Sequence, residues 1–204
     1  MSFVVRVAAT KGVLLRLREQ LGFIEKGKEI LKMKREQLAG EINRLLAEVK
    51  TRGELEKEIM ESYEHLKKAH STLGYQSLQS MALTVGQIDV TGLTYSVMGV
   101  VVPELRIEKE VDISNVPSGV AYEAAEKLSP LLGKIIRLGE SEAKIERLVD
   151  EFMSTNRKVN ALEQIVIPSI SGTIRYIEGR LYEEMLEEFI RTKHVREVIR
   201  RRRA

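Results

Sequence analysis

Leucine and isoleucine residues recur at alternating steps of three and four along the first third of the chain. They lie on one seam of 18 positions between residues 14 and 73, and 13 of these positions are apolar. A spacing that averages about 3.5 residues keeps a narrow stripe facing a partner helix, which is the condition for a coiled coil. A helix over residues 10–73 is about 96 Å long at roughly 1.5 Å per residue. The pattern therefore predicts an elongated helical chain in which Thr10 caps the first helix and Gly74 ends it.

A second helical pattern occupies the last third of the chain. Ser129 and Pro130 form a start signal, a Ser N-cap followed by Pro at the first helical position. A shorter helix is expected just before it, at residues 120–128. Apolar residues then follow a seam over residues 131–189, and beyond Val159 their mean spacing rises to about 3.75, which favours a relaxed or reversed left-handed supercoil. Pro168 interrupts this pattern, so we expect a bend there and not a stop.

The stretch between the two patterns, residues 75–117, is rich in valine, threonine and isoleucine, as is typical of strands. Thr91 and Gly92 are the expected turn of a hairpin. The sequence thus predicts a mainly α fold, with two long helices forming an antiparallel coiled coil and a small irregular head that contains a β-hairpin. The predicted segments are residues 1–73 for the first helix, 74–118 for the head, and 119–204 for the second helix, kinked near residue 168.

Charged residues interrupt the first seam, and the antiparallel arrangement predicts acids opposite them. With the two helices running back from the head, Arg35 lies opposite Glu163 and Arg52 lies opposite Glu146. Removing one member of a buried ion pair costs roughly 3–5 kcal/mol, so such pairs would fix the register of the two helices.

Positive charge is concentrated at one end of the chain. The formal net charge is only +3, but residues 191–203 hold seven basic residues and one acid. There is no cysteine, which excludes disulfides and thiolate chemistry. The apolar patch around Val4 and Val5 is shorter than the core of a signal peptide, and the longest apolar run, residues 97–102, is far below the roughly 20 residues that span a bilayer. We expect a soluble, cytoplasmic protein without direct membrane insertion.

No pattern of catalytic, cofactor-binding or metal-binding residues emerges from the sequence. Gly133 and Lys134 lack the preceding glycine and the following Ser or Thr of a phosphate-binding loop. His65 and His70 are five residues apart and so lie on different helix faces, which disfavours a shared metal ion. We therefore predict no catalytic residue, no cofactor and no metal ion.

Two other functions remain open from the residues themselves. The arginines of residues 200–203 suit phosphate contacts, so one alternative is a coiled-coil arm or tether that binds RNA or DNA through this basic tip. Salt-dependent nucleic-acid binding that is lost on deleting residues 200–204 would favour it. The other is a small enzyme with its site in the head, which turnover surviving removal of both long helices would favour.

Three runs of sequence carry a resemblance to a known family. The most specific is TNRKVNALE at residues 155–163, followed by IVIP at residues 165–168. Gly27 with LKMKREQL at residues 31–38 is the second, and IRYI at residues 174–177, continuing through Leu181 to Lys193, is the third. Together they resemble the D subunit of the V-type and archaeal A-type rotary ATPases and ATP synthases. The resemblance covers both helices and is weak over the head.

The resemblance implies a central rotor shaft that is not itself catalytic. In this family the two ends of an antiparallel helical pair enter the ring of catalytic and regulatory subunits, A and B, and the middle of the chain forms the base of the shaft. The F subunit packs on the coiled coil, and the funnel-shaped C subunit links the base to the membrane ring. The protein is then peripheral at the inner face of the cell membrane, with no nucleic-acid partner. The implied contact residues are Lys32, Lys34, Arg35, Arg157, Lys158, Asn160, Glu163, Arg175, Tyr176, Arg191 and Lys193.

Overall fold

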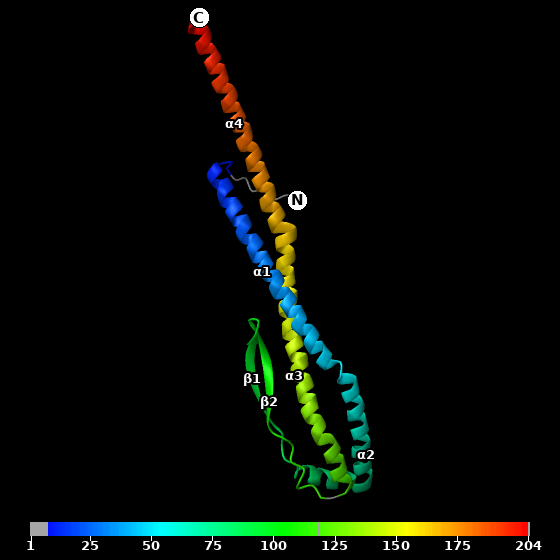
Figure 1. Cartoon of the computed structure of the whole chain (residues 1–204). Helices are drawn as coiled ribbons and strands as arrows, with labels where there is room; N and C mark the ends of the chain where they lie inside the picture. Colours follow the sequence, from blue (N-terminus) through cyan, green and yellow to red (C-terminus); the bar gives the residue numbers. More distant parts are fainter. Residues whose placement is uncertain (1–7, 118, 204) are drawn as a thin grey trace. The chain divides into compact units, whose positions relative to one another are not determined.

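The computed structural model describes residues 8–117 and 119–203 (Figure 1). Residues 1–7, which include the apolar patch at Val4 and Val5, lie outside the described residues, as do Ser118 and Ala204. The elements in chain order are α1 (Lys11–Val49), α2 (Arg52–Ala82), β1 (Asp89–Val97), β2 (Val100–Lys109), α3 (Val120–Ala161), the π-helical turn η1 (Leu162–Val166) and α4 (Ile167–Arg203). The mainly α class, with long helices and one antiparallel β-hairpin, is confirmed.

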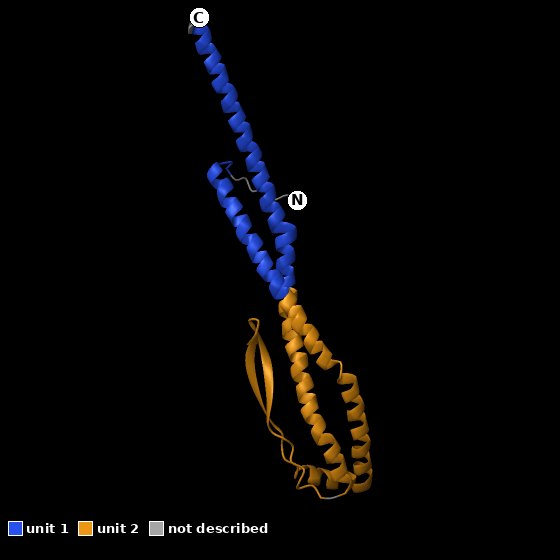
Figure 2. Cartoon of the chain, viewed as in Figure 1, with its two compact units in different colours: residues 1–35, 154–204 blue, residues 36–153 orange. Residues whose placement is uncertain are grey.

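The chain divides into two compact units (Figure 2). The first unit contains residues 1–35 and 154–204, and in it the first part of α1 lies antiparallel to α4. The second unit contains residues 36–153, in which α2 and α3 run antiparallel with the β-hairpin beside α3. Within each unit, helical segments far apart in the sequence therefore lie side by side.

The first helical segment begins as predicted but is not continuous. The N–H of Val13 donates a hydrogen bond to Thr10 Oγ1 at 3.3 Å, which confirms the predicted N-cap. The prediction of one unbroken helix to residue 73 is wrong, because the α-helix is interrupted at Lys50 and Thr51. Helix α2 also continues past Gly74, which breaks its regular geometry with a φ of +74°. Glycine is the residue that adopts this conformation without a steric penalty.

The interruption at residues 50 and 51 has a counterpart in the spacing of the buried residues. Leu38 and Leu45 are buried and one heptad apart, as are Leu55, Ser62 and Ala69 in α2. The step from Leu45 to Leu55 is three residues longer than a heptad. An insertion of three residues overwinds a continuous coiled coil, and the break accommodates it locally. For this reason the buried stripe of α2 contains Ser62 and Ala69, whereas Tyr63 and His70, two of the 18 positions of the predicted seam, are exposed.

The second helical segment begins at Val120, where the short preceding helix was predicted to begin. The predicted new start at Ser129 and Pro130 is wrong, because α3 runs on through these residues and Pro130 lies inside it. Proline removes one helical N–H, leaving the carbonyl of Glu126 without its usual donor. Both Pro130 and Glu126 are exposed, so water can bond to that carbonyl.

A π turn follows α3 and precedes Pro168. In η1 the N–H of Ile167 donates to the carbonyl of Leu162, five residues back, and the chain stays helical through Pro168. A π turn holds one residue more than an α turn. The buried residues Val159 and Ile174 are one residue more than two heptads apart. The π turn thus accommodates the extra residue between Val159 and Ile174, which contributes to the longer mean spacing of the apolar residues beyond Val159.

The β-hairpin turns at Met98 and Gly99, not at the predicted Thr91 and Gly92, which lie within β1. Val97 pairs directly with Val100, and the two residues between them have φ values of +53° and +82°. Positive φ at both positions is the requirement of a two-residue type I′ turn, which matches the twist of the flanking strands.

The hairpin packs on the helices of the second unit through its apolar end. Val102 is buried in one cluster with Leu38, Leu45 and Leu148, and Val97 and Val100 pack against it. A charged contact supports the same docking, because Lys144 Nζ lies 5.2 Å from the centre of the Tyr95 ring and pairs with Glu140. Burial lowers the pKa of Lys144, but hydrogen bonds to Glu140 and Tyr95 outweigh it and the net pKa is raised.

Leu45→Ala should destabilise the second unit by about 2–5 kcal/mol, because it leaves a cavity where α1, α3 and the hairpin meet. The neighbouring change Leu46→Ala is the matched control, since Leu45 is 5% exposed and Leu46 is 41% exposed. Urea unfolding followed by circular dichroism measures both changes. Equal losses for the two variants would contradict the assigned core.

Candidate partner-binding surface

Cross-helix polar contacts hold the two helical segments of the first unit in register. Lys32 Nζ lies 2.6 Å from a Glu163 carboxylate oxygen, and Arg18 lies 2.6 Å from Glu178. All four residues lie within the first unit, with Glu163 in the π turn. These pairs join positions of the chain that are more than 100 residues apart, so they connect the two helices and not successive turns of one helix.

The observed register differs from the predicted one by about one helical turn. Arg35 does not pair with Glu163; it donates a hydrogen bond to Asn156 Oδ1 at 3.2 Å, and Lys32 takes the carboxylate instead. In the second unit Arg52 pairs with Glu142 at 2.9 Å and not with Glu146. The predicted register assumed an unbroken first helix that ends at residue 73. The break at residues 50 and 51 and the continuation of α2 past Gly74 invalidate that assumption.

The Lys32 and Glu163 pair alters the titration of both groups. The hydrogen bond from Lys32 lowers the pKa of Glu163, and the positive charges of Lys32, Lys28 and Arg35 add to this effect against a smaller opposing contribution from burial. The same hydrogen bond raises the pKa of Lys32. Both side chains are about one third exposed, so water screens the pair and its main effect is to select a register.

The structure separates the predicted contact residues into two groups. Lys32, Arg35 and Glu163 meet at the interface between the helices, and the Lys34 side chain is half-buried. The others have exposed side chains on the outer faces of α3 and α4: Arg157, Lys158, Asn160, Arg175, Tyr176, Arg191 and Lys193. The first group therefore joins the two helices, and the second group is accessible to another molecule.

The last part of α4 is a helix without a partner among the described residues of this chain. Arg18 pairs with Glu178, and α1 begins at Lys11, seven residues before Arg18. Because the two helices are antiparallel, the position opposite Lys11 is Met185, seven residues after Glu178. The N-terminal end of α1 therefore lies opposite Met185. Every described side chain from residue 182 to 202 is exposed, and Figure 1 shows this end of α4 extending beyond the start of α1. The predicted seam through Met185 and Phe189 thus has no helix to pack against within residues 8–117 and 119–203, which corrects the expectation that it is buried in an intrachain coiled coil.

This exposed segment is amphipathic. Its apolar side chains recur at helical spacing and form one stripe: Tyr182, Met185, Leu186, Phe189 and Ile190, which are 49–68% exposed. Its last turns are strongly basic. Scattered apolar residues on a surface are normal, but a contiguous stripe of large ones marks an interaction site. We call residues 182–202 the exposed tip.

A second line of large exposed apolar residues follows the outer face of α1. Leu15, Phe23, Ile30 and Met33 recur at steps of eight, seven and three and are 55–78% exposed. The sequence analysis missed this surface because its residues lie off the heptad seam. Their spacing at roughly seven-residue intervals is the signal that identifies a second apolar face.

Neither a metal site nor a membrane span is found within residues 8–117 and 119–203. In this part of the chain, no group of three His, Asp or Glu side chains is placed to hold a metal ion. No helix of this part is long and apolar enough to cross a membrane.

Comparison with known proteins gives a consistent result over nearly the whole chain. The sequence model of the family of ATP synthase D subunits matches residues 13–197. The chain is 33% identical to the A-type ATP synthase D subunit of Methanopyrus kandleri, over 97% of this chain and 88% of the relative. It is 33% identical to the V-type ATP synthase D subunit of Thermotoga neapolitana, over 96% of this chain and 99% of the relative. It is 35% identical to the A-type ATP synthase D subunit of Methanobrevibacter smithii, over 95% of this chain and 87% of the relative.

Glu163→Gln should lower the thermal unfolding midpoint at pH 7 and lose this effect in acid. The pKa of Glu163 is lower in the folded chain than its ordinary value of 4.5. Its ionised form therefore stabilises the fold above that pH, and the contribution disappears as the pH falls through the lowered pKa. Thermal unfolding of both proteins at pH 7 and at a series of pH values below 4.5 measures the difference. Glu187→Gln, on the exposed tip, is the control, and a difference for Glu163→Gln that does not depend on pH would contradict the pairing.

Proposed function

This chain belongs to the family of ATP synthase D subunits, and we propose that it is the central shaft of a V/A-type rotary ATPase or ATP synthase. In this role it transmits torque between a catalytic hexamer and a membrane ring that translocates ions. The proposed partners are the catalytic and regulatory A and B subunits, the F subunit, and the funnel-shaped C subunit at the base. The proposed location is peripheral, at the inner face of the cell membrane.

The single observation that carries the proposal is the exposed tip. Residues 182–202 form a regular helix whose apolar stripe has no partner in the described chain. Exposing such a stripe to water is unfavourable, which argues for a surrounding protein surface that covers it. A ring of subunits provides that surface on all sides.

The paired helices of the first unit suit the mechanical requirement. A shaft must resist twisting, and a single helix bends easily. Arg18 with Glu178 and Lys32 with Glu163 connect the two helices on either side of the buried residues Ile174 and Ile177. Contacts of this kind oppose sliding of one helix along the other, and sliding is the motion that would dissipate torque.

The proposed role is structural and not catalytic. Charged side chains at the interface between the helices are engaged with each other, as in the contacts of Lys32 and Arg35. Catalytic carboxylates or histidines are instead expected in a concave site with strongly shifted pKa values. ATP chemistry is therefore assigned to the surrounding hexamer. The match over residues 13–197 favours this role over a nucleic-acid-binding arm, since that alternative depends on the basic tip alone.

Replacing the apolar stripe of the exposed tip should weaken binding to the hexamer without unfolding the chain. For Met185→Ser with Phe189→Ser we expect a loss of at least about tenfold in affinity, because large apolar anchors dominate interface energies. The unfolding midpoint should change little, since the two side chains are 60% and 68% exposed. Titration of the purified chain against the catalytic hexamer of A and B subunits measures the affinity. Glu183→Ser with Glu187→Ser, on the opposite face of the same turns, is the matched control, and equal losses in both pairs would refute the role of the stripe.

A reversible crosslink tests rotation itself. The chain has no cysteine, so Glu187→Cys introduces a single thiol on it. When this thiol is joined by a disulfide to a cysteine placed in the adjoining protein of the ring, ATP hydrolysis by the complex should stop, because the shaft can no longer turn. Reduction should restore turnover. The single-cysteine complexes should hydrolyse ATP normally under both conditions, and continued turnover in the fully crosslinked complex would exclude the shaft function.

A further inference from the structure

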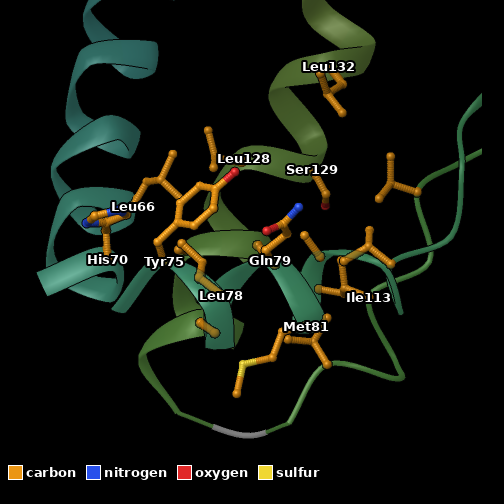
Figure 3. Close-up of a pocket in the computed structure, with 17 residues that line it drawn as sticks. Leu66, His70, Tyr75, Leu78, Gln79, Met81, Ile113, Leu128, Ser129 and Leu132 are labelled. Carbon is orange, nitrogen blue, oxygen red and sulfur yellow. The ribbon is translucent and has the colours of Figure 1, made fainter. Parts of the chain in front are cut away.

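A pocket of about 440 Å³ lies in the second unit where α2, the segment after β2 and the start of α3 meet (Figure 3). It has no part in the contacts described above. Its origin is the kink at Gly74, whose φ of +74° turns the last part of α2 and places Tyr75 and Leu78 in its wall. Ala121 and Ala124, both buried, present only methyl groups on the α3 side, and this leaves the space unfilled.

The lining specifies the chemistry of an occupant. Thirteen of the 17 lining residues are alanine, valine, leucine, isoleucine or methionine, and none is Asp, Glu, Lys or Arg. An ionised ligand would therefore enter without a counter-charge, which is unfavourable. The volume lies in the range of small-molecule sites, roughly 300–1,000 Å³.

A few polar groups interrupt the apolar lining. Gln79 and Ser129 both line the pocket, and Figure 3 shows the amide of Gln79 turned toward Ser129. Tyr75 and His70 form an aromatic edge, with ring centres 6.3 Å apart and planes tilted by 58°. An apolar pocket with a small number of converging hydrogen-bonding groups is the usual form of a ligand site, in which the polar groups fix the orientation.

We propose that this pocket binds a neutral, largely apolar small molecule whose one hydrogen-bonding group meets Gln79 and Ser129. The apolar body lies against Leu66, Leu128 and Leu132. None of the lining residues belongs to the exposed tip or to the first unit, so binding here is tested separately from ring binding and rotation.

The test uses the full-length chain and the neutral fluorescent probe 1-N-phenylnaphthylamine. We expect saturable fluorescence enhancement and competition by decan-1-ol. Octan-1-ol should compete about 15-fold less well, because each buried methylene raises the affinity about fourfold. Decanoate at about pH 8 has the same chain length but is ionised, so it should compete at least about tenfold less well than decanol.

Variants locate the binding at this pocket. Ala82→Trp, at an exposed lining position, should reduce probe affinity at least about tenfold, and Ala125→Leu, which fills the pocket from α3, should do the same. Ala47→Trp, at an exposed alanine of α1 outside the lining, is the matched control and should bind as the wild type does. Gln79→Met should weaken decanol about fivefold while leaving the probe bound.

Three results would overturn the proposal. The first is the absence of saturable probe binding to a folded wild-type chain. The second is equal binding by Ala82→Trp, Ala125→Leu and Ala47→Trp, which would place the probe elsewhere. The third is probe binding that decanol does not displace, which would leave the pocket as an apolar contact for another protein. None of these results bears on the ring-binding and crosslinking tests.

Discussion

Burial of one narrow stripe between antiparallel helices is the interaction on which each unit depends. The largest fully buried side chains include Leu38 and Leu148 in the second unit and Val159 and Ile177 in the first. With so few buried residues, helical propensity alone does not hold these segments, and most of their stability comes from the packed stripe. A residue added to the heptad repeat must be accommodated locally, because otherwise the apolar stripe would rotate away from the partner helix and become exposed. The interruption at Lys50 and Thr51 and the π turn before Pro168 are the two places where this happens.

Helix type and stripe position were predictable because both follow from local periodicity. Long runs of leucine and isoleucine at helical spacing predict a helix with one buried face, and a cluster of β-branched residues predicts strands. The turn at Met98 and Gly99 was missed because Met is an unusual residue at positive φ, whereas Thr91-Gly92 has an equally good local signal. The register was missed by one turn because it depends on the sum of all interruptions between two paired residues. Such a sum cannot be read from one short motif.

In the candidate site, too, single residues were predictable from short motifs, whereas their partners on the other helix were not. The resemblance over residues 155–163 identified Glu163 as important, and the structure places it against Lys32 from the other helix. Its partner could not be assigned from charge pattern alone, because Arg35 is also basic and only one turn away. The exposed tip was misinterpreted for a different reason: an apolar stripe looks the same in sequence whether its partner is in the same chain or in another. Only the end of α1 at Lys11 shows that the stripe beyond it is left uncovered.

The π turn at Leu162–Val166 gives this region a tolerance for chain length that ordinary helix lacks. Each residue added or removed in an α-helix rotates everything beyond it by about 100°. Deleting one residue within the π turn would instead restore ordinary α-helix and leave Val159 and Ile174 two heptads apart, so Ile174 would stay on the buried stripe. A deletion in the regular helix before the turn has no such reserve and changes the angular setting of all 37 residues of α4 at once. Homologous chains should therefore differ in length within the turn more readily than in the regular helix on either side of it.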